Sequence, residues 1–186
     1  MKKILQQKEK VLHQIAEEVL VSDIKTKKIK TILKEMSDAL KSQDDGVAIA
    51  APQIGYALRI FVVSGKIFDK NFGKNREEIS LNENNITEKE KKEEIKDMVF
   101  INPKISKLSR DKEWVPEGCL SVRWLYGKTH RSKKATVSAY DETGKKFTRG
   151  ASGLLAQIFQ HETDHLDGVL FTDHAKDIRE ELPQVK

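Results

Sequence analysis

The stretch Gln160-His161-Glu162-Thr163-Asp164-His165 constrains this chain more than any other, because it sets two imidazoles four residues apart with a carboxylate after the first. If the stretch is helical, residues four apart lie on one face of the helix, and the pattern is typical of metal-dependent hydrolases. The flanking residues predict a helix over 152–168. Ser152 suits the N-cap, no proline follows, and Gly168 suits the position just after the last turn.

The predicted helix has one mostly apolar arc and one polar arc. At about 100° per residue, the first arc contains Leu154, Leu155, Ile158, Phe159, His161, Glu162, His165 and Leu166. The second arc contains Gln157, Gln160, Thr163, Asp164 and Asp167. Both histidines and the glutamate are therefore expected to face the core, where a polar side chain without a partner is costly. A divalent metal would provide that partner, and the alternative is a core helix whose histidines form local hydrogen bonds.

The length and charge of the chain narrow the class of protein. With 186 residues it is expected to form a single domain, residues 1–186, with a core of its own. Charged residues make up 34% of the sequence and no apolar run approaches the length of a membrane span, which excludes an integral membrane protein. The basic start lacks the apolar segment of a signal peptide, so a cytoplasmic location is expected. The net charge of +5 permits an acidic partner without requiring one.

The order of the predicted elements indicates an α+β fold. A helix is expected from a cap at Ser22-Asp23 to about Ser42, and strands are expected over 58–63, 98–103 and 135–140 with a hairpin turn at 141–144. Because strands and helices do not alternate regularly, antiparallel strands are expected to pack around the late helix. Residues 65–97 are rich in Asn, Glu and Lys and are interpreted as a charged surface insertion without chemistry.

Residues 46–55 are small and apolar apart from Gln53. Small side chains allow another backbone to approach closely, as a ligand in extended conformation would, and the alternative is a tight buried turn. In either case the Gln53 amide needs a hydrogen-bond partner, and it can donate to an oxygen.

Cys119 is the best candidate for a third metal ligand. Catalytic zinc-like sites usually take three protein ligands and leave one position open, and no residue downstream of His165 suits the position. Cys119 is the only cysteine and lies in a turn that contains Gly118. One thiolate and two imidazoles suit ferrous iron or zinc; the alternative is a small hydrophobic residue in a buried turn.

Three stretches together resemble the peptide deformylase family. Its motifs Gly-x-Gly-Leu-Ala-Ala-x-Gln, Glu-Gly-Cys-Leu-Ser and Gln-His-Glu-x-x-His are similar to residues 46–53, 117–121 and 160–165, in this order. The resemblance implies a cytoplasmic metallo-hydrolase that removes formyl from N-formylmethionyl nascent peptides and releases formate. It also implies one divalent metal, Fe(II) in the cell and replaceable by zinc, nickel or cobalt, and a monomer that acts near the ribosomal exit tunnel without specific nucleic-acid or membrane binding.

The resemblance also assigns residues. It implies that Cys119, His161 and His165 bind the metal, and that Glu162 is general base and then general acid. The implied oxyanion donors are the Gln53 side chain and the backbone N–H of Leu120. Substrate contacts are implied at Gly46, Val47, Ala48, Ile49, Gly118, Leu154 and Ile158. Glu117 and Arg131 are similar to an ion pair that steadies the cysteine turn.

Four positions depart from the family pattern. Ala48 replaces a glycine and Ile49 replaces the usual leucine. If position 48 requires a positive φ, alanine costs roughly 1–2 kcal/mol; otherwise its methyl group crowds the substrate. Arg123 and Trp124 stand where many relatives have proline or glycine, which predicts an altered rim of the pocket. These departures leave open a deformylase-like amidase with altered acyl or peptide preference, or a catalytically silent peptide-binding relative.

Overall fold

The computed structural model describes residues 2–69, 72 and 95–183. The helices are α1 (Lys27–Lys41) and α3 (Gly153–Leu166), and the strands are β1 (Ala48–Ala50), β2 (Ile60–Val63), β3 (Met98–Leu108), β4 (Lys112–Gly118), β5 (Leu125–Ser132), β6 (Lys134–Tyr140), β7 (Lys146–Ser152) and β8 (Lys176–Glu180). Short 3-10 turns lie at Lys10–His13, Val21–Asp23, Ala51–Ile54, Gly65–Phe68 and Phe171–Asp173.

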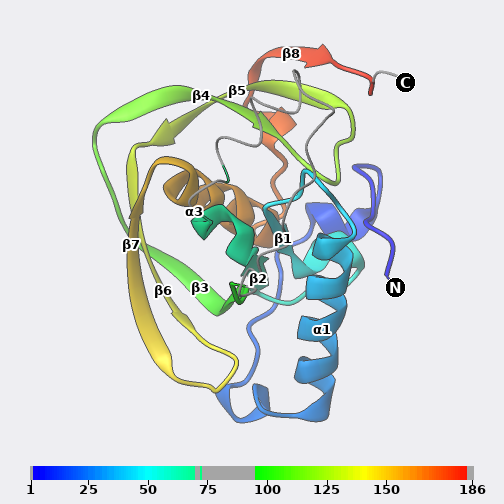
Figure 1. Ribbon diagram of the computed structural model, residues 1–186, viewed down its shortest axis with the longest axis vertical. Coiled ribbons are helices and arrows are strands. Elements are labelled where there is room, and N and C mark those ends of the chain that lie inside the picture. The colour runs from blue at the N-terminus through cyan, green and yellow to red at the C-terminus, as the bar shows by residue number, and fades with distance from the viewer. Residues whose placement is uncertain (1, 70–71, 73–94, 184–186) are drawn as a thin grey trace, which may run out of the picture.

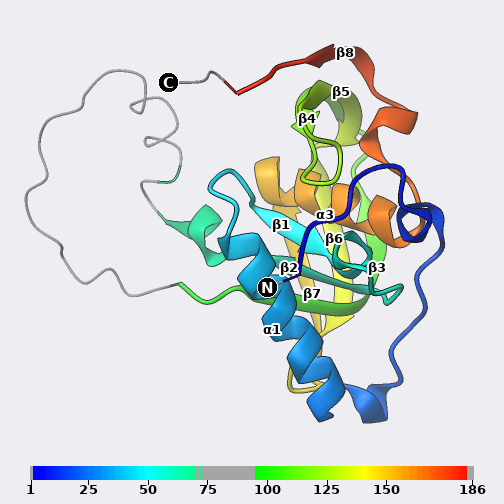
Figure 2. The same cartoon turned by 90° about the vertical axis from the view of Figure 1, so that its right-hand side faces the viewer.

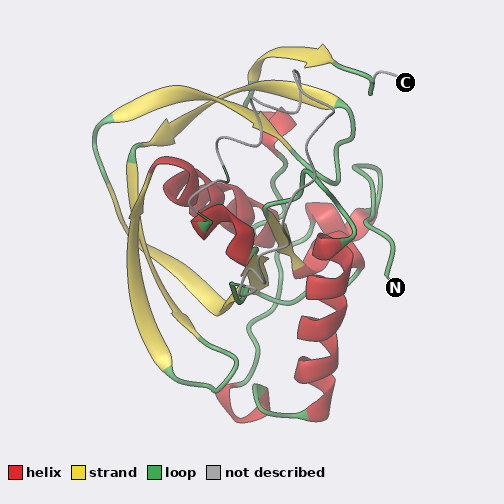
Figure 3. Ribbon diagram, viewed as in Figure 1, coloured by secondary structure: helices red, strands yellow, loops and turns green. Residues whose placement is uncertain are grey.

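The strands form two antiparallel sheets around α3. One has the order β1-β2-β3-β6-β7 and the other has the order β4-β5-β8. Figure 1 shows the long strands curving around α3, with α1 standing on the other side of the molecule. In Figure 2 the three-stranded sheet lies above α3 and the five-stranded sheet below it. Figure 3, in the view of Figure 1, distinguishes the helices from the strands by colour. The predicted α+β fold with antiparallel strands around the late helix is confirmed.

The helix α1 begins later than the sequence predicted. Its N-cap is Thr26, whose Oγ1 accepts a hydrogen bond from the Ile29 N–H at 3.5 Å. The predicted cap at Ser22-Asp23 is wrong because Val21–Asp23 forms a separate 3-10 turn, and the Thr26 hydroxyl donates to the Asp23 carbonyl at 2.7 Å. The predicted apolar stripe is buried as expected, and it comprises Ile29, Ile32, Leu33, Met36 and Leu40.

The helix α3 has nearly the predicted bounds, but one of its faces was predicted incorrectly. Ser152 is the N-cap residue, and Gly168 has a φ of 74° just beyond the helix. Leu154, expected to be buried, is 38% exposed, whereas Gln160, expected on the polar arc, is 7% exposed. The reason is that the Gln160 amide bonds both the N–H and the carbonyl of Ser132, at 2.9 and 3.0 Å, at the end of β5. Part of the predicted polar arc is therefore buried, where Gln160 meets the end of β5.

Three buried phenylalanines pack α3 against the five-stranded sheet. The Phe61 and Phe100 rings stack with centroids 4.5 Å apart, and the Phe159 ring meets Phe100 edge-on at 5.2 Å. All three side chains are fully buried. Because closely packed aromatic rings resist displacement, this cluster holds the histidine-bearing helix at a set distance from β2 and β3.

Asn102 should be a sensitive position for stability. It has a φ of 51°, and its side chain accepts from the Val19 N–H at 2.8 Å and donates to the Val19 carbonyl at 2.7 Å. Asn102→Ala should lower the free energy of unfolding by about 2–5 kcal/mol, because two buried backbone groups lose their partner. Asn102→Gly should lose about 1 kcal/mol less, since glycine tolerates positive φ. Urea denaturation tests both, and equal losses would contradict the backbone argument.

The described ends of the predicted insertion lie close together. The Gly65 N–H donates to the Asp97 carboxylate at 3.1 Å. Residues 70–71 and 73–94 of the segment lie outside the described residues, so the interpretation of 65–97 as a surface insertion stays a prediction. None of the helices in the described part of the chain combines the length and apolar character needed to span a bilayer.

Candidate active site

Cys119, His161 and His165 come together from two separate elements. Both histidines lie on α3, and Cys119 directly follows β4. Their ligand atoms all lie within 4.8 Å of one another, and Cys119 Sγ is 3.1 Å from Nε2 of His165. The Ser121 N–H also donates to Sγ at 3.4 Å. The donor set of one thiolate and two imidazoles fits a transition metal such as iron or zinc.

Glu117 orients one of the two histidines. Its Oε1 accepts from His161 Nδ1 at 2.7 Å and from Arg131 Nη2 at 2.7 Å, while its Oε2 accepts from Arg131 Nε at 3.1 Å. Because an ionised carboxylate only accepts, Nδ1 of His161 carries a proton, and Nε2 is the ring nitrogen directed toward a metal. Burial would raise the pKa of Glu117, but the bonds from His161 and Arg131 hold that pKa well below its usual range.

The electrostatics of the cluster favour a positive charge between the ligands. Burial lowers the pKa of His165 well below its usual range, which keeps this imidazole neutral and able to bind a metal. Burial would also lower the pKa of His161, but its contacts with Cys119 and Glu117 outweigh burial and raise that pKa. The three ligand atoms lie close together beside the ionised Glu117, and these residues fit a divalent metal ion.

Glu162 follows His161 in the chain and lines the same pocket. Its side chain is 3% exposed, and its Oε2 has no hydrogen-bond partner among the described residues. Burial raises its pKa to about 7. A carboxyl group with such a pKa accepts and returns a proton near neutral pH, as a general base or acid must. A buried oxygen without a protein partner also suggests a group kept free for a reacting molecule.

The side-chain amide of Gln53 and the backbone N–H of Leu120 both lie near Cys119. Gln53 is 1% exposed, and its Oε1 accepts from the Ala50 N–H at 2.8 Å. This contact orients the amide, so that Nε2 points to Ser121 Oγ at 3.1 Å and to Cys119 Sγ at 3.6 Å. Within the described structure, the backbone N–H of Leu120 takes part in no hydrogen bond. The Leu120 N–H is therefore available to a negative oxygen near the Cys119 sulfur, whereas the Gln53 amide would have to exchange its 3.6 Å contact with that sulfur to donate to one.

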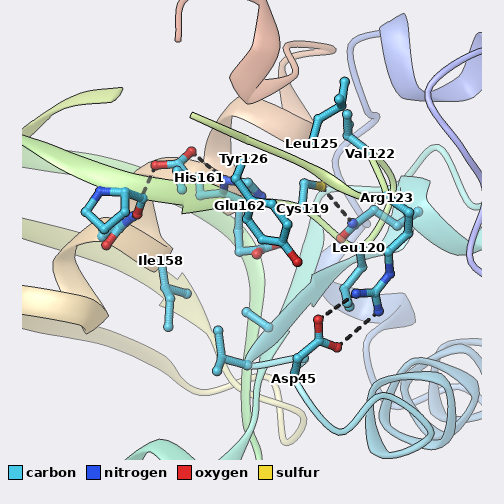
Figure 4. A pocket seen from close by; sticks show the side chains of 18 of the residues that line it. Asp45, Cys119, Leu120, Val122, Arg123, Leu125, Tyr126, Ile158, His161 and Glu162 are labelled. Carbon is cyan, nitrogen blue, oxygen red and sulfur yellow. Dashed lines mark hydrogen bonds and ion pairs between the residues drawn. The ribbon is translucent and has the colours of Figure 1, made fainter. Parts of the chain in front are cut away.

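A pocket of about 260 Å³ opens beside these groups. It is small compared with the roughly 300–1,000 Å³ of sites for drug-sized ligands. Figure 4 shows Cys119, His161 and Glu162 at this pocket, with Ile158 on one side and Arg123 and Asp45 on another. Among the residues predicted to touch substrate, those that line the pocket are Gly46, Val47, Ala48, Gly118, Leu154 and Ile158.

The positions where the chain departs from the family pattern can now be placed. Ile49 does not line the pocket, and its side chain is fully buried against α1, because successive residues of a strand point to opposite faces. Ala48 lies in the extended strand β1, and the described non-glycine residues with positive φ are Asn102 and Asp177. The idea that Ala48 strains the backbone is therefore wrong. Its methyl group instead forms part of the pocket wall.

Comparison with known proteins decides the family. The family model described as polypeptide deformylase matches residues 1–181. The chain belongs to the peptide deformylase family. Peptide deformylase 2 of Clostridium acetobutylicum is 40% identical over 146 residues, which are 78% of each protein. The chloroplastic/mitochondrial peptide deformylase 1A of Arabidopsis thaliana is 36% identical over 163 residues, or 88% of this chain and 57% of the relative.

A solved deformylase shows the same fold. The structure of the class I type b peptide deformylase from Acinetobacter baumannii with bound Met-Ala-Ser superposes with a TM-score of 0.73 at 25% identity, over 94% of this chain and 99% of the other. Together with the Cys/His/His group, these matches identify a peptide deformylase, a metallo-hydrolase.

The deformylase site also contains residues that the sequence did not reveal. Tyr126 pairs with Gly118 across β4 and β5 and lines the pocket, and Thr129 donates to Glu117 Oε2 at 2.6 Å. Gln157, assigned to the polar arc of the helix, lines the pocket and donates to the Pro116 carbonyl at 2.9 Å. Only the alternation of residues along 125–132 could have suggested the inward positions, because the partners come from other elements.

Gly118 should tolerate no side chain. A Cβ at this position would lie 2.7 Å from Cδ1 and 2.8 Å from Cε1 of Tyr126. Gly118→Ala should therefore move the ring or the turn and lower kcat/KM for formate release by about ten- to hundredfold. The double variant Gly118→Ala/Tyr126→Ala should recover most of the loss, because the clash is gone. A double variant no better than Gly118→Ala would show that the ring is not the cause.

Proposed function

We propose that this deformylase removes the N-formyl group from N-formylmethionyl nascent peptides, with a divalent metal bound by Cys119, His161 and His165. The observation that carries the proposal is the buried Glu162 carboxylate, which lies beside the three ligands with one oxygen free of protein partners. The relative from Acinetobacter baumannii binds Met-Ala-Ser, the kind of peptide that remains after formyl is removed. The products would be formate and a free amino terminus.

Each residue has a defined part in this hydrolysis. When bound, the metal supplies a water of lowered pKa. Glu162 takes the proton of this water and returns it to the departing amine nitrogen, so that one carboxylate acts as base and then as acid. As the oxygen of the attacking water bonds to the formyl carbon, Nε2 of Gln53 and the N–H of Leu120 would donate to the negative oxygen that develops there. When this oxygen becomes a carbonyl again, the C–N bond breaks, the amine takes the proton from Glu162, and formate leaves.

The strand β1 offers the peptide a place to bind. It is an edge strand of the five-stranded sheet, because β2 is its only neighbour in that sheet among the described strands. An extended peptide that enters at Gly46 can add to this free edge through backbone hydrogen bonds. The methionine side chain would then contact Val47, Ile158 and Leu154, which line the pocket. The ring of His161 lines the same pocket.

We assign Fe(II) as the native metal, with zinc, nickel and cobalt as substitutes. The thiolate ligand supports this assignment, since it suits iron as well as zinc. An iron-loaded sample should lose activity in air while a nickel-loaded sample keeps it, because an accessible thiolate beside Fe(II) is readily oxidised.

We also infer a single catalytic domain and a cytoplasmic monomer that acts on chains as they leave the ribosome.

Formate release tests the function directly. The chain, purified anaerobically and loaded with Fe(II), should release formate from formyl-Met-Ala-Ser, and the same chain stripped of metal by a chelator should not. Acetyl-Met-Ala-Ser should be hydrolysed far more slowly, which separates a deformylase from an amidase with altered acyl preference. Tight binding of both peptides without any formate would contradict the proposal and indicate a binding protein.

A further inference from the structure

Arg123 and Asp45 form an ion pair at the pocket. The guanidinium of Arg123 contacts both carboxylate oxygens of Asp45, with Nη1 2.5 Å from Oδ2 and Nη2 3.1 Å from Oδ1. Nη2 also donates to Gln43 Oε1 at 2.7 Å. Figure 4 shows the two charged groups facing each other. A two-pronged contact between charged groups is stronger and more directional than a single hydrogen bond between neutral groups.

The ion pair connects two segments that are distant in the sequence. Asp45 immediately precedes Gly46, where the chain enters β1, and Arg123 lies in the turn that follows Cys119. Both segments line the pocket. The first leads to the strand edge proposed to bind the peptide, and the second contains the Leu120 N–H proposed to bind the oxyanion. The distance between these two segments therefore affects how well one peptide can contact the strand edge and the Leu120 N–H together.

Arg123 is held more firmly than its partner. Its side chain is 20% exposed, whereas that of Asp45 is 50% exposed. The guanidinium lies 5.1 Å from the centre of the Trp124 ring, and the backbone N–H donates to Gln6 Oε1 at 3.4 Å. Nε2 of the same Gln6 donates to the Leu120 carbonyl at 3.1 Å. Arg123 thus belongs to a braced turn, to which it ties the segment that leads into β1.

We propose that the ion pair between Arg123 and Asp45 sets the width of the pocket and so positions the peptide between the Leu120 turn and the free edge of β1. This role rests on the proposed function, since it concerns the peptide substrate of that reaction. Without either partner the segment that leads into β1 can move away, while the turn after Cys119 stays held by Gln6 and Glu162 and the metal ligands keep their places. The ion pair therefore governs KM, and the chemical step stays nearly unchanged.

Variants of the two residues test this role. Arg123→Ala and Asp45→Ala should each raise KM for formyl-Met-Ala-Ser about tenfold with kcat within about twofold of wild type. The double variant should resemble Arg123→Ala, because without Arg123 the loss of Asp45 removes no further contact between the two segments. Arg123→Lys should give an intermediate KM, because lysine keeps the charge but cannot form the two-pronged contact.

A matched control separates positioning from stability. Arg59 and Asp167 form an ion pair of 2.7 Å whose side chains are 14% and 51% exposed, close to the values for Arg123 and Asp45, and neither residue lines the pocket. Asp167→Ala should leave KM unchanged even if it lowers the melting temperature. An increase in KM of similar size in this control would assign the effect to loss of stability and overturn the proposal.

Binding of the product peptide gives the same test without turnover. Calorimetry with Met-Ala-Ser and the metal-loaded protein should show about tenfold weaker binding for Arg123→Ala and for Asp45→Ala. Single variants with KM and Kd within about twofold of wild type would refute the role, as would single effects that multiply in the double variant. A wild-type chain that binds Met-Ala-Ser but releases no formate would contradict the proposed function, while the Kd values would still decide the role of the ion pair.

Discussion

Replacing Glu162 with glutamine should lower kcat for formate release by about two to four orders of magnitude. Glutamine has nearly the same volume but cannot take a proton from water or return one to the leaving amine. The metal ligands are untouched, so the metal content per protein should stay at the wild-type value. Steady-state formate assays combined with elemental analysis of the purified variant test both parts of this expectation.

The fold of the Glu162→Gln variant serves as its control. One oxygen of Glu162 has no protein partner in the described structure, so the amide breaks no hydrogen bond at that atom. A melting temperature near that of wild type is therefore expected. A variant that is folded, carries metal and retains more than about a tenth of the wild-type kcat would assign the proton transfer to another group.

The second large effect is expected at Arg131. Its side chain is 8% exposed and bonds Glu117, 3% exposed, as well as Asp164. Arg131→Ala should lower the free energy of unfolding by about 3–5 kcal/mol, because it leaves a buried carboxylate without its partner. Glu117 would then hold His161 less firmly, and metal affinity should fall about ten- to hundredfold. Chemical denaturation and competition with a chelator measure the two losses.

An exposed ion pair supplies the comparison for Arg131. Lys104 contacts Glu18 at 2.7 Å, and both side chains are more than half exposed. Lys104→Ala should leave stability and metal affinity nearly unchanged, because water screens such pairs. If both variants lost similar amounts of stability and metal affinity, burial of the Arg131 ion pair would not be the cause of these losses. Arg131→Ala with wild-type metal affinity would show that Glu117 does not need Arg131 to orient His161.

Local patterns in the sequence predicted the elements of the site but not their surroundings. The 152–168 helix was recognised because its caps and its histidine spacing lie within one short segment. The start of α1 was misplaced by a few residues, since Ser22, Asp23 and Thr26 are all suitable caps and only the closed 3-10 turn selects Thr26. The burial of Gln160 depended on Ser132, which lies on β5 and is distant in the sequence.

Residue types and their local spacing predicted the chemistry available to this protein: a thiol, two imidazoles at helical spacing, a carboxylate between them and an amide in a small apolar segment. None of these features depends on contacts between distant segments of the chain. The folded structure was needed to show that Glu117 also bonds His161, that Tyr126 pairs with Gly118, and that Arg123 reaches Asp45. Such contacts depend on strand register and on the crossing of distant segments, for which a single sequence contains no local signal.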